Sequence, residues 1–386
     1  MKRPREDSNA CCSEPDLVSC QKVDAHPEHL GVARLSFPDG TDVDFKGHID
    51  GDSSTFIYTD TNGTECSIFF NPQTNGMFGH IMTSEGRSFV LEYCGEEEGH
   101  IYKEIDVQSY QEDDGMDQLI RDDNYKARRG LNKILLRGDI DRSTVVTYSV
   151  QIYYTKEVAE AHRNLKDVFK ELIHETNQGY INSKVPLRIK LHCSKQVDIA
   201  DGQSSYKSLK DLRRLNPSNK EILNSADVAV LIVNSFKQSN KCGLAGTFEI
   251  DSRETFSVVK MSCALGQYTF GHEIGHNVGL FHNIDNSRYR NNKYPYGHGY
   301  HISRGTLDSG FSTILAYPKK GHWFRVNYYS NPNVIYPKTG TRTGQSKTAN
   351  NARVLIQRRF DLADIGDEMT TCVDNGKLFS ALSISN

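Results

Sequence analysis

The stretch that decides the fold of this chain is GHEIGHNVGLFH, at residues 271–282. His272 and His276 are four residues apart, so on a helix they project from one face, one turn apart. Gly279 permits a backbone turn that ends the helix and brings His282 round as a third ligand. Three imidazoles with one position left for water are typical of a catalytic zinc site. We therefore expect His272, His276 and His282 to bind one zinc ion.

Glu273 follows the first histidine and is the expected catalytic base. Its carboxylate can hydrogen-bond a water in the open position of the metal, and zinc lowers the pKa of that water to near neutrality. If the motif consisted only of two histidines and one glutamate, the histidines could equally be surface residues on an amphipathic helix. Here five positions are fixed together, which favours the zinc site.

The sequence around this motif has the pattern of strands and helices that is typical of an α/β domain. Strands are expected at residues 145–154, 187–191, 228–233 and 256–259. A helix is expected at residues 156–177, where apolar residues recur at helical spacing. Strand and helix alternate, so we expect an α/β (α+β) fold with a mixed, mostly parallel sheet and a zinc-binding helix.

Four further segments complete the expected domain organisation. Residues 1–29 are polar and predict a disordered tail, and residues 30–110 predict a small antiparallel β domain, because short alternating runs are separated by Gly-rich or Asn-rich turns. Residues 111–141, acidic and then basic, predict an exposed charged linker. The catalytic domain is expected at 142–366 and a C-terminal tail at 367–386.

The pattern HExxHxxGxxH is the signature of the metzincin metallopeptidases. Over residues 145–365 the chain resembles the reprolysin (adamalysin-like) branch. The segments that carry this resemblance are CGLA at 242–245, FSVV at 256–259, YTFGH at 268–272, YPYG at 294–297, FSTILAYP at 311–318, YYSNP at 328–332 and NNAR at 350–353. The resemblance implies a zinc-dependent endopeptidase that cleaves internal bonds of protein or peptide substrates. Residues 47–52 resemble part of the propeptide of such enzymes, which implies a zymogen.

Two positions differ from the pattern of this branch, and the resemblance suggests a catalytic role for a third residue. Leu315 stands where the family has a Met beneath the metal, and the similar volume of Leu predicts a working site. Asn283 stands where the branch often has Asp. Tyr317 corresponds to a tyrosine that in some branches approaches the zinc and stabilises the oxyanion, so it is a candidate catalytic residue. A Tyr packed in the turn is the alternative.

The composition and charge of the chain bear on its partners and its location. The formal net charge of -3 argues against a nucleic-acid partner. No apolar run is long enough for a membrane span, and no apolar segment follows the basic N-terminus, so we expect no secretory signal peptide. The family resemblance suggests secretion, and an intracellular location is the alternative. The basic cluster at residues 2–5 is either a nuclear address or a solvated terminus. The sequence does not predict the oligomeric state.

Several cysteines and histidines have open assignments. Cys242 and Cys263 could form a disulfide, or remain buried thiols in a reducing compartment. His298, His301 and His322 lie near the expected cleft in sequence but lack ligand spacing. We interpret them as surface residues, with substrate contact as the alternative.

Activation by cleavage after the dibasic pair at residues 128–129 follows from the propeptide resemblance. Cys66 and Cys94 are candidate thiolates that could occupy the zinc's open position, steric blocking is a second mechanism, and a permanent N-terminal partner is a third. A non-catalytic binding protein built on the same fold is the alternative function. The intact Glu273 argues against it, and Leu315 keeps it open.

Overall fold

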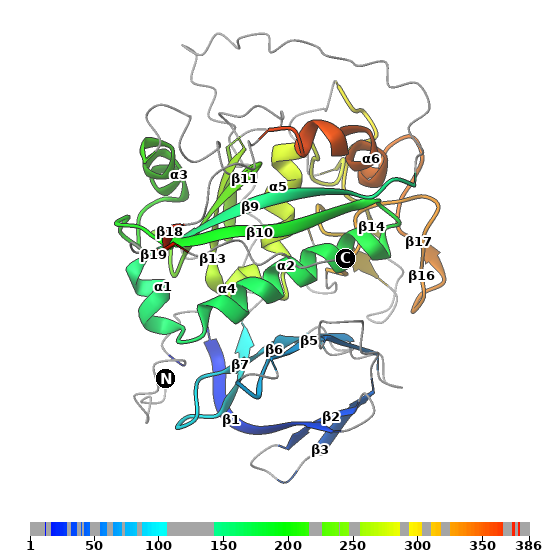
Figure 1. The fold of residues 1–386 in the computed structure, drawn as a ribbon. Coiled ribbons are helices and arrows are strands. Elements are labelled where there is room, and N and C mark those ends of the chain that lie inside the picture. Colours follow the sequence, from blue (N-terminus) through cyan, green and yellow to red (C-terminus); the bar gives the residue numbers. More distant parts are fainter. Residues whose placement is uncertain are drawn as a thin grey trace.

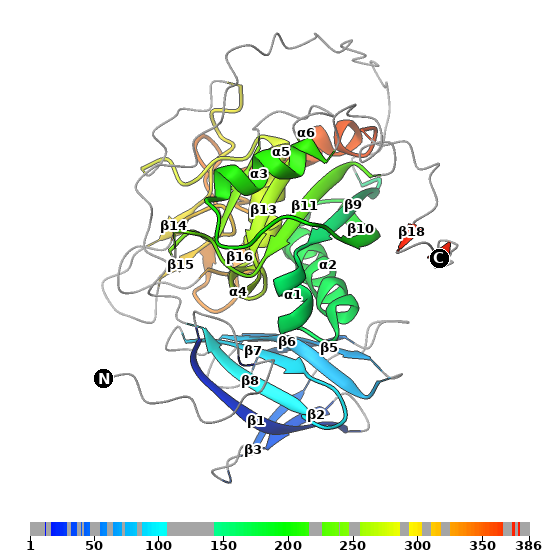
Figure 2. The same ribbon diagram turned by 90° about the vertical axis from the view of Figure 1, so that its left-hand side faces the viewer.

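The computed structural model shows an N-terminal β-sheet stacked against an α/β part that contains the zinc motif (Figure 1, Figure 2). The structure describes residues 12, 17–28, 32–36, 40, 42–46, 55–59, 65–71, 74–82, 87–105, 143–215, 226–238, 240–246, 255–285, 293–302, 310–317, 325–365, 373–374 and 377–378. Within these ranges, no helix is long and apolar enough to span a bilayer.

The N-terminal part is one antiparallel sheet with the strand order β3-β2-β1-β8-β7-β6-β5-β4. Its strands are β1 (Leu17–Glu28), β2 (Val32–Ser36), β3 (Asp42–Lys46), β4 (Thr55–Thr59), β5 (Glu65–Asn71), β6 (Gly76–Met82), β7 (Ser88–Tyr93) and β8 (His100–Ile105). The hairpin from β5 to β6 turns at Asn75, whose φ of 56° is a conformation that Asn tolerates. Ile68, Met77 and Leu91 are fully buried in the core of this sheet.

Residues 17–28 differ from the expected tail at residues 1–29. They form β1, which pairs with both β2 and β8. Apolar side chains alternate with exposed ones in its second half, where Val23 and Ala25 are buried. The first half is mostly exposed and shows no such alternation, so the alternation with a period of two that marks a strand is too short to recognise in the sequence.

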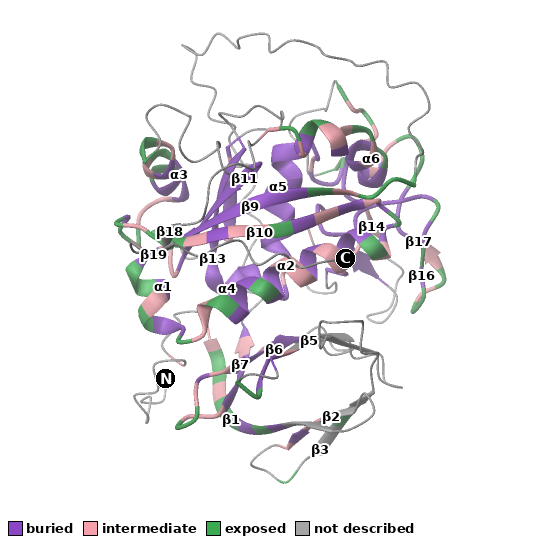
Figure 3. Ribbon diagram, in the orientation of Figure 1, coloured by how far each residue is buried: buried purple, intermediate pink, exposed green. Residues whose placement is uncertain are grey.

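The α/β part is built on a five-stranded sheet with the order β10-β9-β11-β13-β12. These strands are β9 (Val146–Tyr154), β10 (Leu187–Gln196), β11 (Val228–Val233), β12 (Gly243–Ala245) and β13 (Phe256–Lys260). The first four strands of the order pair in parallel, and β12 joins the edge antiparallel. The predicted mixed α/β fold is therefore confirmed. β11 is buried along its whole length, as its aliphatic sequence predicts (Figure 3).

The helices of this part are α1 (Lys156–Ala161), α2 (Leu165–Asn182), α3 (Ser205–Arg214), α4 (Met261–Ala264), α5 (Thr269–Val278) and α6 (Asn351–Leu362). The single helix expected at residues 156–177 is two helices. Thr155 caps α1 by accepting a hydrogen bond from the Val158 backbone N–H, and His162 then leaves the helix with an extended φ of -132°. No Pro or Gly marks this break in the sequence, and the helical spacing of apolar residues continues across it. The sequence pattern therefore predicts one helix.

Short hairpins follow α5: β14 (His301–Ile302) with β15 (Phe311–Ser312), β16 (Ile335–Tyr336) with β17 (Thr341–Arg342), and β18 (Val373–Asp374) with β19 (Lys377–Leu378). One disulfide joins Cys242, beside the edge strand β12, to Cys263 in α4. A second joins Cys12 to Cys20. Of the two open assignments for Cys242 and Cys263, the structure has the disulfide.

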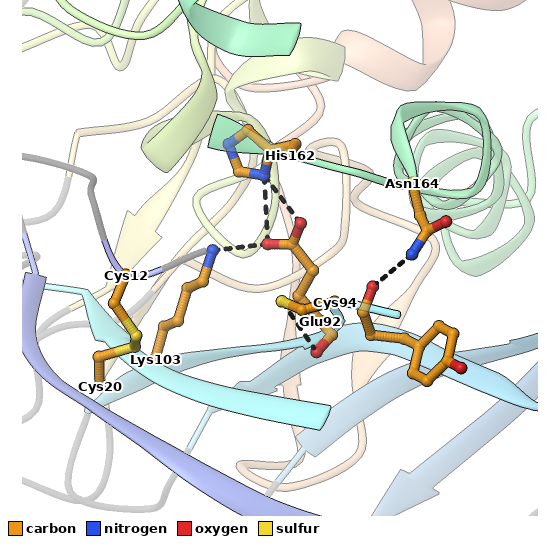
Figure 4. A network of polar contacts seen from close by, with 8 residues as sticks. Cys12, Cys20, Glu92, Cys94, Lys103, His162 and Asn164 are labelled. Atoms are coloured by element: carbon orange, nitrogen blue, oxygen red, sulfur yellow. Dashed lines mark hydrogen bonds and ion pairs between the residues drawn. A yellow bond between two sulfur atoms is a disulfide. The ribbon is translucent and has the colours of Figure 1, made fainter. Parts of the chain in front are cut away.

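The N-terminal sheet docks on α1 and α2 through a buried ionic cluster (Figure 4). Glu92 of β7 bonds the Lys103 ammonium at 2.5 Å and the His162 Nδ1 at 2.9 Å, and all three side chains are at most 3% exposed. Burial alone would raise the pKa of Glu92, but the charges of His162 and Lys103 lower it to about 2. Asn164, the N-cap of α2, donates to the Tyr93 carbonyl at 2.7 Å.

Apolar and aromatic contacts extend this interface. Phe78 of β6 is 1% exposed and belongs to the main hydrophobic core of the α/β part. The ring of His80 meets Tyr268 edge-on at 6.0 Å, next to the start of α5. Asn71 donates to Asp167 of α2 at 2.9 Å. The N-terminal sheet therefore shares a continuous core with the α/β part.

Candidate metal centre

Helix α5 positions two of the three candidate ligands. It begins after Tyr268, whose φ is 54°, and ends at Gly279, whose φ is 106°. Only Gly adopts the latter conformation without strain. The Gly279 N–H donates to the His276 carbonyl at 2.9 Å, which closes the helix and turns the chain toward His282. The turn predicted at Gly279 is thus confirmed.

The three histidines converge on one point. Their Nε2 atoms lie 3.1 Å apart between His272 and His282, 3.0 Å between His272 and His276, and 2.9 Å between His276 and His282. In a tetrahedral zinc site with Zn–N of about 2.05 Å, ligand atoms lie roughly 3.3 Å apart. The Nε2–Nε2 distances in the triad are slightly shorter than this value, and the three histidines form a group that could hold a metal ion.

Hydrogen bonds at the opposite ring nitrogens fix how the imidazoles face one another. The His272 Nδ1 donates to the Ile314 carbonyl at 2.7 Å, and the His276 Nδ1 donates to the Leu280 carbonyl at 2.8 Å. Both Nε2 atoms therefore carry lone pairs, and such a cluster is stabilised by a shared cation. Burial first, then His276 and Arg325, lower the pKa of His272 well below its ordinary value, which keeps it neutral as a ligand must be.

Glu273 is buried, at 4% exposure, and faces the edge strand β12. A Cβ at Gly243 would lie 2.5 Å from the Glu273 Oε1 and 2.9 Å from its Cδ. The Glu273 carboxylate therefore occupies the space that any side chain at residue 243 would need.

The turn at residues 314–317 lies against the triad. Leu315 is fully buried, and its Cδ2 would be 3.1 Å from a Cβ at Gly275, so Leu packs closely on the zinc-motif helix where the family has Met. The Tyr317 ring centroid is 4.1 Å from that of His282. The Asn283 Oδ1 accepts from the Tyr317 N–H at 3.0 Å, which ties this turn to the residue after the third histidine.

A family model for metallo-peptidase family M12 matches residues 144–330, which include the triad, Glu273 and the turn. Residues 144–330 are an M12 metallopeptidase domain of the reprolysin-like type. This family implies zinc, and the chemistry of the three imidazoles fits that ion.

Curated relatives of the metallopeptidase domain carry one name. The peptidyl-Asp metalloendopeptidase of Stenotrophomonas maltophilia (strain K279a) is 32% identical over 229 residues, which are 57% of this chain and 53% of the relative. The protein of the same name from strain R551-3 is 27% identical over 340 residues, 85% of this chain and 78% of the relative. The chain thus spans about half the length of the first of these relatives.

Among solved structures, metalloproteinase-II from Bacteroides fragilis aligns with a TM-score of 0.35 at 9% identity. The alignment covers 63% of this chain and 78% of that one.

Of the three further histidines that are predicted to lie on the surface, His298 differs from that prediction. His298 is 2% exposed, and its Nδ1 donates to the His282 carbonyl at 2.8 Å, so it supports the third ligand. The surface interpretation of His298 is wrong, because the polar segment around it folds against that ligand. His301 is partly exposed and pairs with Asp285 at 2.9 Å. His322 lies outside the described residues.

The prediction that Cys94 is a candidate thiolate for the open position of the metal is wrong. It is disulfide-bonded, so it does not supply a thiolate to the metal. The side chain of Cys66 and the dibasic pair at residues 128–129 lie outside the described residues.

The sequence assigned no role to Gly243 or Arg325, and it placed His298 on the surface. Each acts through a contact with a residue far along the chain, and spacing alone cannot show such a contact.

Proposed function

We propose that this chain is a zinc-dependent metalloendopeptidase in which His272, His276 and His282 hold the metal and Glu273 is the general base. The observation that carries the proposal is the convergence of three Nε2 atoms within 2.9–3.1 Å of one another, on and just after the helix that bears Glu273. A zinc ion held by these residues would polarise the scissile carbonyl and lower the pKa of a bound water.

Glu273 accepts a proton from the water that attacks the scissile carbonyl carbon, and later donates it to the leaving amine. The space left by Gly243 lets the carboxylate take this position. Tyr317 donates a hydrogen bond to the developing oxyanion, a role supported by the closeness of its ring to His282. Asn283 holds the Tyr317 backbone in place.

We propose that the substrate is a protein or peptide cut beside an aspartyl residue. The support is the shared name of the curated relatives, peptidyl-Asp metalloendopeptidase. The Cys12–Cys20 and Cys242–Cys263 disulfides, together with the disulfide-bonded Cys94 and Cys193, further support a working place in an oxidising compartment, such as the outside of the cell.

We also propose that the N-terminal sheet belongs to a zymogen that is cut after residues 128–129. Its support is the docked interface around Glu92, which holds the sheet against the metallopeptidase domain. Blocking of the cleft by the intact chain, rather than by the Cys94 thiol, is the mechanism to test. The folded chain is digested with an Arg-specific protease while peptide hydrolysis is followed. Activity that does not rise as the linker is cut would contradict latency.

The proposed function is tested by zinc analysis and by hydrolysis of a protein substrate, with and without a chelator, before and after the linker is cut. One zinc per chain and chelator-sensitive cleavage are expected. Stoichiometric zinc without cleavage in either form would favour a non-catalytic binding protein.

A further inference from the structure

One buried amide joins the segment after the third histidine to the turn at residues 314–317. Asn283 is 2% exposed, and its Oδ1 accepts from the Tyr317 N–H at 3.0 Å. On its other side, the Asn283 Nδ2 donates to the Asp285 Oδ1 at 2.7 Å. The Tyr317 ring packs on His282, with ring centroids 4.1 Å apart, so this amide links the third ligand to the turn.

The orientation of the Asn283 amide decides whether the turn is held. An amide oxygen accepts hydrogen bonds, whereas the NH₂ group only donates. If the amide were turned over, its NH₂ group would face the Tyr317 N–H and its oxygen would face the Asp285 carboxylate, and both bonds would be lost. An ionised carboxylate accepts only, so Asp285 selects the orientation in which Asn283 can hold the turn.

Asp285 is held from a second side. Its side chain is 46% exposed, and its Oδ2 pairs with the His301 Nε2 at 2.9 Å. His301 lies in β14, where it stands opposite Ser312 of β15. Since β15 leads directly into the turn at residues 314–317, the contacts of Asn283, Asp285 and His301 begin and end at that turn.

The need for an orienting partner follows from the identity of residue 283. The reprolysin-like branch often has Asp at this position, and either oxygen of a carboxylate accepts, so no neighbour has to orient it. The amide of Asn283 accepts through one oxygen only. Asp285 is the neighbour that binds the other end of this amide.

We propose that Asp285 is a positioning residue of the metal centre, which orients the Asn283 amide and thereby holds Tyr317 for catalysis. This inference rests on the proposed endopeptidase function, in which Tyr317 donates to the developing oxyanion. The oxyanion forms only in the transition state, so poor alignment of its donor lowers kcat and leaves KM nearly unchanged.

The test is a double-mutant cycle, with kcat and KM measured on one peptide after the linker is cut. Asp285→Ala should lower kcat about tenfold, a part of the roughly 10²- to 10³-fold that removal of an oxyanion donor costs. In the Asn283→Asp background, the new carboxylate needs no orienting partner and is repelled by Asp285, so adding Asp285→Ala should leave kcat unchanged or raise it. In the Tyr317→Phe background, which lacks the hydroxyl, Asp285→Ala should add less than about a twofold loss. Asp361→Ala is the matched control, because this exposed aspartate pairs with Arg358 at 3.0 Å in α6, and it should keep the wild-type kcat.

Hydrogen exchange at the Tyr317 N–H reports the orientation of the amide independently of activity. Followed by NMR with isotope-labelled tyrosine, this exchange should be slow in the wild type, faster in Asp285→Ala and slow again in Asn283→Asp/Asp285→Ala. Zinc content and thermal melting of each variant separate positioning from loss of the metal or of the fold. If the Asn283→Asp variants do not fold, Asp285→Asn decides, because it keeps an oxygen that can accept from the Asn283 amide and should retain kcat within about threefold.

Equal losses from Asp285→Ala with Asn283 and with Asn283→Asp would overturn the assignment. A Tyr317 exchange rate that Asp285→Ala leaves unchanged would overturn it too, as would a tenfold loss in Asp285→Asn. A wild type that cleaves the peptide while the Asp285 variants keep their kcat removes the inference and leaves the endopeptidase standing. A wild type that cleaves neither this peptide nor a generic protein removes the proposed function itself.

Discussion

Gly243→Ala is the sharpest probe of how the fold places Glu273. An added Cβ would lie 2.5 Å from the Glu273 Oε1, 2.8 Å from its Cγ and 2.9 Å from its Cδ. Ordinary van der Waals contacts begin near 3.4 Å, so the carboxylate must move by nearly 1 Å. A displacement of about 1 Å in a reacting group costs on the order of 10²-fold in rate, or roughly 2.7 kcal/mol of transition-state stabilisation.

The assay for Gly243→Ala measures kcat/KM on one peptide, together with zinc content and thermal melting. We expect zinc to be retained and the melting temperature to fall modestly, because crowding the buried Glu273 side chain costs about 1–3 kcal/mol, whereas Ala in a strand is favoured over Gly by only about 0.5–1 kcal/mol. Ala245→Gly, in the same short strand, is the control and should keep near-native turnover. Near-native turnover in Gly243→Ala would refute the placement of Glu273 against β12.

Four further changes test separate parts of the structure. His276→Ala removes a ligand and should abolish stoichiometric zinc binding, and zinc analysis that still finds one ion per chain would contradict the ligand set. Leu315→Met should change the stability by less than about 1.5 kcal/mol and keep the metal, as measured by melting, and a large loss would show that the turn packs differently. Replacing both Cys242 and Cys263 by Ser should lower the free energy of unfolding by about 3 kcal/mol in denaturant titration, and an unchanged value would mean that the bond does not form. Because the pKa of Glu92 is lowered to about 2, the charged form stabilises the docked sheet above pH ~4.5, and this stabilisation is lost as the pH falls toward 2. Protease sensitivity of the docked sheet should rise over that range, and an equal rise in Glu92→Gln would contradict the assignment.

The α/β part was predictable because its elements carry strong local signals. Aliphatic β11 and the motif of α5 reveal a buried strand and a metal-binding helix without tertiary information. The turn at Gly279 was readable for the same reason, since one residue type meets its backbone requirement.

The remaining features depend on contacts that no local pattern encodes. At the break between α1 and α2, His162 bonds Glu92 of the N-terminal sheet, a contact 70 residues apart in sequence. His298 and Arg325 act through backbone carbonyls of distant segments. Gly243 carries no side chain, so its importance lies wholly in the Glu273 carboxylate that fills its place.

The role of Glu273 as the base beside three histidine ligands is tested by Glu273→Gln in the linker-cut chain. Zinc content and peptide hydrolysis are measured on the same preparation. Gln is nearly isosteric and cannot accept the proton of the attacking water, so we expect one zinc per chain and a loss of about 10²- to 10⁴-fold or more in kcat. Near-native hydrolysis in this variant, with zinc retained, would show that Glu273 is not the base.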